Sequence, residues 1–175
     1  MAKPIVSIVM GSDSDLPVMQ EAAKIMEEFG IPYEVSIKSC HRIPDVMAEY
    51  AAKAHTRGIR VIIAGACGAA HLPGMISAIT PLPVIGVPVQ TRTMSGIDSL
   101  YSIVQMPPGV PTATVSIGGA KNAGLLAVQI LGSADKKIQE KMIKYKHDLK
   151  KMVIDKATEL EKIGYKKYLE LHGKK

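Results

Sequence analysis

Cysteine is scarce in this chain of 175 residues, because Cys40 and Cys67 are its two cysteines and they do not form a CxxC pair. Two isolated thiols are too few for a disulfide scaffold or a zinc knuckle, so we expect both to be reduced. The chain also lacks an unbroken apolar run of about eighteen residues and the charged, then apolar start of a secretory signal. These absences favour a cytoplasmic location and predict no membrane partner.

The formal net charge of +6 would suit nucleic-acid binding, but the excess lies in one part of the chain. Residues 1–133 hold nine Lys or Arg and nine Asp or Glu, whereas residues 134–175 hold thirteen Lys and seven Asp or Glu. Acidic residues are mixed through this basic segment and aromatic residues do not alternate with the lysines. We therefore interpret it as a solvated helix face and expect no nucleic-acid partner; the weaker alternative is a basic RNA-binding tail.

The content of 47% hydrophobic residues suits one compact domain. Five short apolar runs predict buried strands, and helical periodicity between them predicts helices, so we expect an α/β fold with a parallel sheet between two helix layers. Such sheets bind ligands past the carboxyl ends of their strands. The expected strands are residues 5–10, 33–38, 61–66, 84–87 and 112–117. The expected helices run from a cap at Ser14 or Asp15 to Gly30, from Pro44 to Gly58, within 69–80, and over 98–104.

Beyond Gly132 the apolar residues recur every three or four positions and predict one long helix, with Lys156 interrupting the stripe. A helix of about thirty residues is longer than a small domain needs, so its apolar face is expected to pack on a neighbouring subunit. We therefore predict an α/β domain over residues 1–133. Residues 134–175 are predicted to form a helical extension that packs in a homo-oligomer and is not a separate domain.

The first loop of interest contains Gly11, Ser12, Asp13, Ser14 and Asp15, between a buried strand and a helix. Glycine allows close approach of the backbone, the serine hydroxyls can donate, and a helix N-terminus offers free N–H groups, all of which suit a phosphate. A carboxylate would repel phosphate, so Asp15 is better matched to ribose hydroxyls. A capped turn without a ligand is the alternative reading.

The second loop carries Ser39, Cys40, His41 and Arg42 just past a strand. Arg42 could complete a phosphate cradle through its forked donors. His41 is a candidate general acid or base, because imidazole exchanges protons easily near neutral pH. Cys40 is a rival candidate as a nucleophile, although adjacent strand residues point to opposite faces.

In the third loop, residues 65–75, small side chains would let a flat ring lie against the backbone, with Leu72 as an apolar wall. Tight strand-to-helix packing is the alternative reading of the small residues. His71 is either a second proton carrier or a histidine that only hydrogen bonds the backbone. With one histidine per loop and no carboxylate cluster at ligand spacing, we expect no metal site.

Taken together, GSDSD, SCHRIPD, GACGAAHLPGM, PLPVIGVPVQ and DSLYSIVQMPPGVP closely resemble the PurE family of N5-carboxyaminoimidazole ribonucleotide mutases in purine biosynthesis, over about residues 4–131. The resemblance implies a flavodoxin-like fold, a homo-octamer, and no metal or organic cofactor. It implies a ribonucleotide substrate whose carboxylate moves from N5 to ring carbon C4 through released and recaptured CO2, with His41 as the acid and base. By motif position, Ser12, Asp15 and Arg42 resemble nucleotide-binding residues. Ser14 and Ser39 would support the phosphate, and Gly68, His71 and Leu72 would border the base.

Three departures from the family pattern keep alternatives open. Cys40 stands where the family commonly has Ala and Cys67 where it commonly has Gly, and both add a thiol beside the site. Residues 117–123 also look about two residues shorter than the bacterial mutase pattern, which resembles the related direct carboxylases that join CO2 to aminoimidazole ribonucleotide. The intact HRIPD and AAHLPGM runs favour the mutase. A non-catalytic nucleotide-binding module is the alternative from another class.

Overall fold

The sheet places three loops side by side. The computed structural model describes residues 3–173, and the strands within this range form one parallel sheet in the order β2-β1-β3-β4-β5. From β1 the chain moves to the edge strand β2 and then crosses back to β3 on the other side of β1, so the loops after β1 and β3 flank the switch point between these two strands. The strands are β1 (Val6–Met10), β2 (Tyr33–Ile37), β3 (Val61–Cys67), β4 (Val84–Val89) and β5 (Ala113–Thr114).

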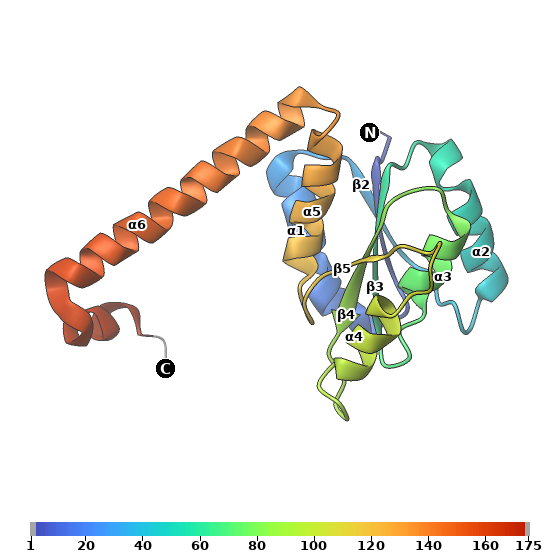
Figure 1. Cartoon of the computed structure of the whole chain (residues 1–175), viewed down its shortest axis with the longest axis horizontal. Coiled ribbons are helices and arrows are strands. Elements are labelled where there is room, and N and C mark those ends of the chain that lie inside the picture. The colour runs from blue at the N-terminus through green and yellow to red at the C-terminus, as the bar shows by residue number, and fades with distance from the viewer. Residues whose placement is uncertain (1–2, 174–175) are drawn as a thin grey trace.

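Helices cover both faces of this sheet, which confirms the expected three-layer fold (Figure 1). The helices α1 and α5 pack on one face, and α2, α3 and α4 pack on the other. Their bounds are α1 (Leu16–Phe29), α2 (Pro44–Lys53), α3 (Leu72–Ile79), α4 (Ile97–Val104), α5 (Ala120–Gly132) and α6 (Lys136–His172), with 3-10 turns η1 (Asp13–Asp15) and η2 (His55–Arg57).

The side chains of β1 contribute to two separate hydrophobic cores, one on each face of the sheet. Ile8 packs with the residues of α1 and α5, whereas its neighbour Val9 packs with those of α2, α3 and α4, because successive side chains of a strand point to opposite faces. Both side chains are fully buried. Burial of an aliphatic side chain of this size stabilises a fold by about 1.5–3 kcal/mol, so both layers hold the sheet firmly.

The elements differ from the sequence expectation at three places. Asp15 occupies the N-cap position of α1, as one of the two expected caps, but the helix is entered through the unexpected turn η1, which Ser12 caps with its side chain. The fifth strand spans two residues instead of six, because Pro88 in β4 has no N–H with which to extend the ladder. The sequence did not predict helix α5, because its small residues make the helical spacing of large apolar residues hard to recognise. One of these small residues, Gly124, packs against Ile25 of α1.

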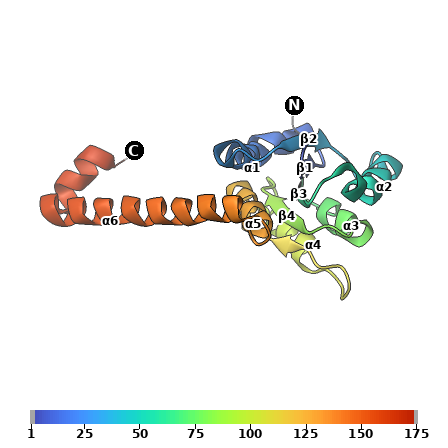
Figure 2. The same ribbon diagram turned by 90° about the horizontal axis from the view of Figure 1, so that it is seen from above.

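The helix α6 leaves the body of the molecule soon after it begins (Figures 1 and 2). Its first turns are attached through Met142, which is buried, and through Tyr145, whose ring centroid lies 5.6 Å from that of Phe29. Farther along, Leu149 and Met152 are exposed, and Gly164 interrupts the helix with a φ of 76°. Within residues 3–173, none of the helices combines the length and apolar character needed to cross a membrane.

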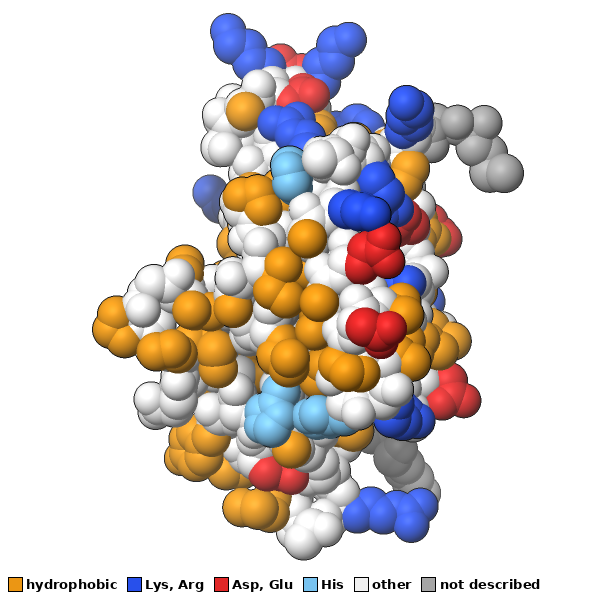
Figure 3. Space-filling model, turned by 90° about the vertical axis from the view of Figure 1, so that its right-hand side faces the viewer, with side chains coloured by type: hydrophobic (Ala, Val, Ile, Leu, Met, Phe, Trp, Pro, Cys, Tyr) orange, Lys and Arg blue, Asp and Glu red, His pale blue; other side chains and the backbone are white. Residues whose placement is uncertain are grey.

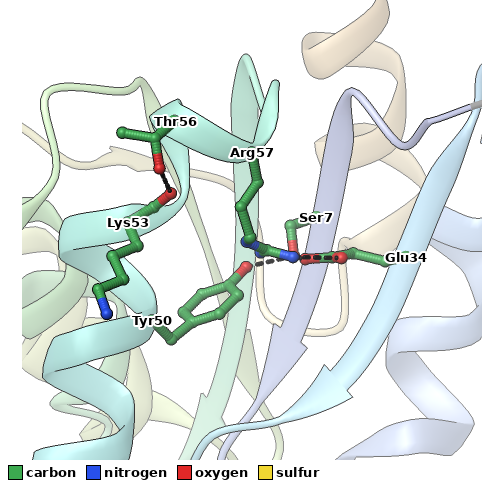
Figure 4. Close-up of polar contacts among 6 residues, drawn as sticks. All are labelled: Ser7, Glu34, Tyr50, Lys53, Thr56 and Arg57. Carbon is green, nitrogen blue, oxygen red and sulfur yellow. Dashed lines mark hydrogen bonds and ion pairs between the residues drawn. The ribbon is translucent and has the colours of Figure 1, made fainter.

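A polar cluster ties α2 and η2 to the amino-terminal half of the sheet (Figure 4). Arg57 donates to both carboxylate oxygens of Glu34 at 2.7 and 2.9 Å, and the Ser7 hydroxyl donates to Glu34 at 2.9 Å. Tyr50 in turn donates to Ser7, and burial raises the pKa of Tyr50 to about 12, so its phenol stays protonated. The cluster fixes the far end of α2, whose near end follows the loop that carries His41.

Candidate active site

Three loops from neighbouring strands enclose one cavity of about 400 Å³, a size suited to a small organic ligand. It lies past the carboxyl ends of β1, β2 and β3. Of the nine residues singled out from the sequence, seven line it and two, Ser14 and Gly68, do not. The lining comprises Gly11, Ser12, Asp15, Ser39, Cys40, His41, Arg42, Ala66, Cys67, Ala69, His71 and Leu72.

Ser12 organises the first loop. Its hydroxyl accepts a hydrogen bond from the Ser14 amide at 3.3 Å and donates to Asp13 at 2.9 Å, while its own amide donates to Asp15 Oδ2 at 3.1 Å. These contacts form a capping box, in which the two ends of the turn satisfy each other. Ser14 is exposed and serves the turn through its amide.

The carboxylate of Asp15 is almost completely shielded from solvent. Its residue surface is 1% exposed, and Oδ1 has no hydrogen-bond partner among residues 3–173. Burial raises the pKa of Asp15, and the neighbouring Cys67 thiol and the backbone at Ser12 and Gly11 oppose that shift. A buried acceptor without a donor is costly, so this oxygen is suited to receive a donor from a bound ligand.

Arg42 links the second loop to the first. Its Nη2 donates to the carbonyl of Gly11 at 2.8 Å and its Nε donates to the Ser39 hydroxyl at 3.1 Å. Ser39 is buried whereas Arg42 is exposed, so two nitrogens of the guanidinium fix its orientation while the charged group remains accessible to a ligand. Ser12, Ser39 and Arg42 also line a second hollow of about 350 Å³, which extends this basic side of the site.

His41 and His71 meet at the mouth of the cavity, although 30 residues separate them in the sequence. Their Nε2 and Nδ1 atoms lie 2.8 Å apart, and the rings are nearly perpendicular, at 86°. Both side chains are exposed. The structure therefore brings the catalytic candidate and the third-loop histidine into direct contact, and it does not bury His71 as a mere backbone-bonded histidine.

Hydrogen bonds to α4 hold the third loop in place. The Gly68 amide donates to Ser99 Oγ at 2.9 Å, and Ser99 donates to the Val89 carbonyl at 2.7 Å. The Gly68 carbonyl accepts from the Ala70 amide at 2.8 Å and lies 3.3 Å from Ser102 Oγ, whose shorter bond goes to the Asp98 carbonyl at 2.7 Å. Gly68 has a φ of +67°, a left-handed conformation that side chains disfavour. It therefore shapes the loop that carries Ala69 and His71 into the cavity.

The two cysteines differ in exposure. Cys40 is 7% exposed and packs in the core between the sheet and α2, and burial raises the pKa of its thiol. Cys67 is exposed to the cavity, and burial, followed by the charge of Asp15, raises the pKa of its thiol as well. A nucleophilic cysteine needs a stabilised thiolate, so neither environment favours the rival reading of Cys40.

Sequence reasoning missed two kinds of residue. Ala66 and Ala69 form part of the wall, and their small size in the third loop was the available signal. Ser99 and Ser102 were overlooked, because their partners lie more than 30 positions away and a serine in a short helix carries no motif.

Apolar side chains gather on the molecular face that carries α2 and α3 (Figure 3). Ile43 and Val46 at the start of α2, and Met75 and Ile79 on α3, are 37–40% exposed. The segment 106–111 follows α4 and packs on α3, where Met106 lies over Gly74 and Ser77 donates to the Pro111 carbonyl at 2.6 Å. The cavity thus opens beside a largely apolar surface.

Comparison with known proteins places these features in a family context. A family model described as AIR carboxylase matches residues 5–152. The chain is 64% identical over 167 residues to an N5-carboxyaminoimidazole ribonucleotide mutase of Synechocystis sp., which covers 95% of each chain. It is 57% identical over 168 residues to a phosphoribosylaminoimidazole carboxylase of Candida glabrata, covering 96% of this chain and 30% of that one.

Among solved structures, the chain resembles a crystal structure of Treponema denticola PurE, with a TM-score of 0.83 and 27% sequence identity. The match covers 90% of this chain and 98% of the other. The two chains therefore share one fold over most of their length.

Proposed function

The chain belongs to the AIR carboxylase family, and from that premise we propose that it is an N5-carboxyaminoimidazole ribonucleotide mutase of de novo purine biosynthesis. Its reaction would move a carboxylate from the exocyclic nitrogen N5 to ring carbon C4. One observation carries the proposal. The imidazole of His41 lines the same cavity as the hydrogen-bond donors of Ser39 and Arg42, and Asp15, whose buried Oδ1 has no hydrogen-bond partner among the described residues, also lines it. A proton carrier, an anion cradle and a hydroxyl acceptor are thus within reach of one nucleotide.

Each side chain takes a role in binding that fits its chemistry. Arg42, with Ser12 and Ser39, binds the phosphate, because a guanidinium and hydroxyls offer donors to an anion. Ser14 supports that loop through the hydrogen bond that its amide donates to the Ser12 hydroxyl. The buried Asp15 accepts from the ribose hydroxyls. His71 and Leu72 border the base in the third loop, and Gly68, expected beside them, instead shapes that loop from outside the cavity lining.

His41 performs the proton transfers. The bond between N5 and its carboxylate carbon breaks and releases CO2, and the electron pair left on N5 takes a proton from His41. The enamine-like C4 then attacks the confined CO2, and His41 removes the proton still carried by C4, which restores the aromatic ring. The proton count balances over the cycle, so one imidazole serves as both acid and base.

Confinement of CO2 matters because an uncharged gas makes no strong contact that would keep it near C4. The small side chains Ala66 and Ala69 leave room for it beside the base. We propose that the reaction uses no metal and no organic cofactor, since its steps are the cleavage of one C–N bond, the formation of one C–C bond, and two proton transfers that an imidazole can perform.

The direct test supplies the purified protein with N5-carboxyaminoimidazole ribonucleotide, without ATP, and follows formation of the C4 carboxylate. Activity should fall by at least about 100-fold in His41→Asn, because general acid–base catalysis is worth that much. Nucleotide affinity should stay within about threefold, as expected for loss of a group that acts in the transition state. His147→Asn, on the exposed face of α6, is the matched control. Normal turnover by His41→Asn would exclude this mechanism.

Direct carboxylation of aminoimidazole ribonucleotide by CO2 is the second candidate, favoured by the short segment 117–123 and the carboxylase relative. A parallel assay with aminoimidazole ribonucleotide and bicarbonate at equal pH distinguishes the two, because a mutase gives the faster initial rate with the N5-carboxy substrate. Binding without turnover of either compound would instead indicate a nucleotide-binding module.

We further propose that the protein is a homo-octamer, in which residues 134–175 pack between subunits as an extension of the domain formed by residues 1–133. Exposed Leu149, Met152 and Leu160 continue beyond the part of α6 that packs on its own body. A cytoplasmic location suits the two free thiols.

A further inference from the structure

The surrounding structure holds the backbone of His71 more firmly than that of His41. His71 lies at the first turn of α3, where its amide donates to the Ala69 carbonyl at 2.8 Å and its carbonyl accepts from the Met75 amide at 2.9 Å. The next residue, Leu72, is 1% exposed and anchors the helix in the core. His41 lies in an exposed turn between β2 and α2. The backbone of His71 is therefore the fixed side of the pair.

The side chain of His41 has one hydrogen-bond partner among residues 3–173, and that partner is His71. The contact joins Nε2 of His41 to Nδ1 of His71 at 2.8 Å. Imidazole has no other polar atoms than its two nitrogens, so this contact leaves Nδ1 of His41 as its free nitrogen. The hydrogen bond made by one ring nitrogen decides which nitrogen carries the proton and how the ring is oriented.

We propose that His71 is a positioning residue, which holds His41 through Nε2 so that Nδ1 of His41 is the atom that exchanges protons with the substrate. This inference rests on the proposed function and specifies its reacting atom. When Nε2 of His41 donates to His71, Nδ1 is bare and can take the proton from C4. That proton is the one Nδ1 delivers to N5 in the next turnover, and His71 neither gains nor loses a proton.

Two variants of His71 separate positioning from other roles. His71→Leu removes the partner of Nε2, so His41 can rotate, and kcat should fall by about 10–100-fold, the range found when a residue that orients a functional histidine is lost. His71→Asn places an amide atom where Nδ1 stood, so it should recover most of that loss. In both variants KM should stay within about threefold, because the phosphate and ribose contacts are made by other loops.

The readouts are kcat and KM for the N5-carboxy substrate and the midpoint of thermal unfolding, with the exposed His55→Leu as the control. A proton carrier in its own right would not be rescued by Asn, so equal loss in His71→Asn and His71→Leu overturns the proposal. Unchanged kcat in His71→Leu, or a rise in KM alone, also overturns it.

The His41→Asn variant distinguishes a failure of the positioning role from a failure of the proposed function. If His41→Asn turns over normally, the proposed mechanism fails as a whole. If His41→Asn is inactive while His71→Leu matches the unchanged protein, the positioning role alone fails. The double variant of His41→Asn with His71→Leu should be no slower than His41→Asn, since a positioning residue has nothing left to position.

Discussion

The Ser12 amide donates to Asp15 Oδ2 at 3.1 Å, and this bond leaves Oδ1 of the same carboxylate buried without a hydrogen-bond partner among the described residues. The turn therefore satisfies half of the carboxylate and leaves the other half to a ligand. Since Asp15 is 1% exposed, its charge is held in an environment that stabilises it poorly. Such a group favours ligand binding at the expense of the stability of the free protein.

The first prediction concerns Asp15→Asn. The amide oxygen can still accept from Ser12, but the NH2 group then stands where Oδ1 stood and cannot accept from ribose hydroxyls, so KM should rise by about tenfold or more. At neutral pH the variant should be more stable than the unchanged protein, by about 1 kcal/mol, because a poorly solvated charge is gone. Initial rates over a range of substrate concentrations, and urea unfolding, measure both effects.

The pH dependence of that stability difference has a definite sign. Burial raises the pKa of Asp15 above its ordinary value of 3.8, so the folded protein holds this proton more tightly than the unfolded chain. The free energy of unfolding of the unchanged protein should therefore fall, relative to Asp15→Asn, as pH rises from 3.8 through the folded pKa. A constant difference across that range would show that Asp15 is not destabilised by its burial.

The second prediction concerns the serine behind the third loop. Ser99→Ala leaves the Gly68 amide and the Val89 carbonyl without their partner, which should cost about 1–3 kcal/mol of folding free energy. Because the loop carries His71, kcat should also fall. Ser102→Ala is the matched variant and should be milder, since the Gly68 carbonyl keeps the Ala70 amide as its donor and the shorter bond of Ser102 goes to the Asp98 carbonyl of its own helix. Equal effects of the two substitutions would contradict this ranking.

The convergence of the three loops could be predicted from the sequence, because parallel strands end at the same edge and Gly11, His41 and Gly68 all follow strands. The contacts within the site could not. Whether His41 meets His71 depends on turns in separate loops, and no local propensity encodes that distance. The helix α1 begins after Asp15, one of the two caps that the sequence allowed, but the 3-10 turn before it and its side-chain cap, Ser12, were not predicted.

The third prediction concerns the polar cluster at the opposite end of the sheet. Hydrogen bonds from Arg57 lower the pKa of Glu34 below its ordinary value of 4.5. The ionised Glu34 therefore stabilises the fold at pH values above 4.5, and this contribution is lost as the pH falls from 4.5 through the folded-state pKa. Glu34→Gln should cost about 1 kcal/mol at neutral pH, and the cost should vanish in acid. Glu49→Gln, in the exposed pair with Lys53, is the control and should change stability little. Urea unfolding at several pH values measures the difference.

The fourth prediction concerns α6. Positions 142, 145, 149 and 152 follow the same face of the helix, because 3.6 residues make one turn. On this face Met142 is buried in its own body, whereas Leu149 and Met152 are 41% and 43% exposed. An apolar stripe that continues past the body is suited to a neighbouring copy, and a charge placed in such an interface is expensive to bury.

Replacement of Leu149 and Met152 together by Glu should therefore shift the protein from the proposed octamer to smaller assemblies, while the helical content seen by circular dichroism stays unchanged. Lys151→Glu changes the charge on the opposite face of the same helix and should leave the assembly intact. Sedimentation velocity at several protein concentrations measures the mass of each variant. If the Leu149 and Met152 substitutions left the mass unchanged, the exposed stripe would serve something other than subunit packing, and the extension formed by residues 134–175 would need another explanation.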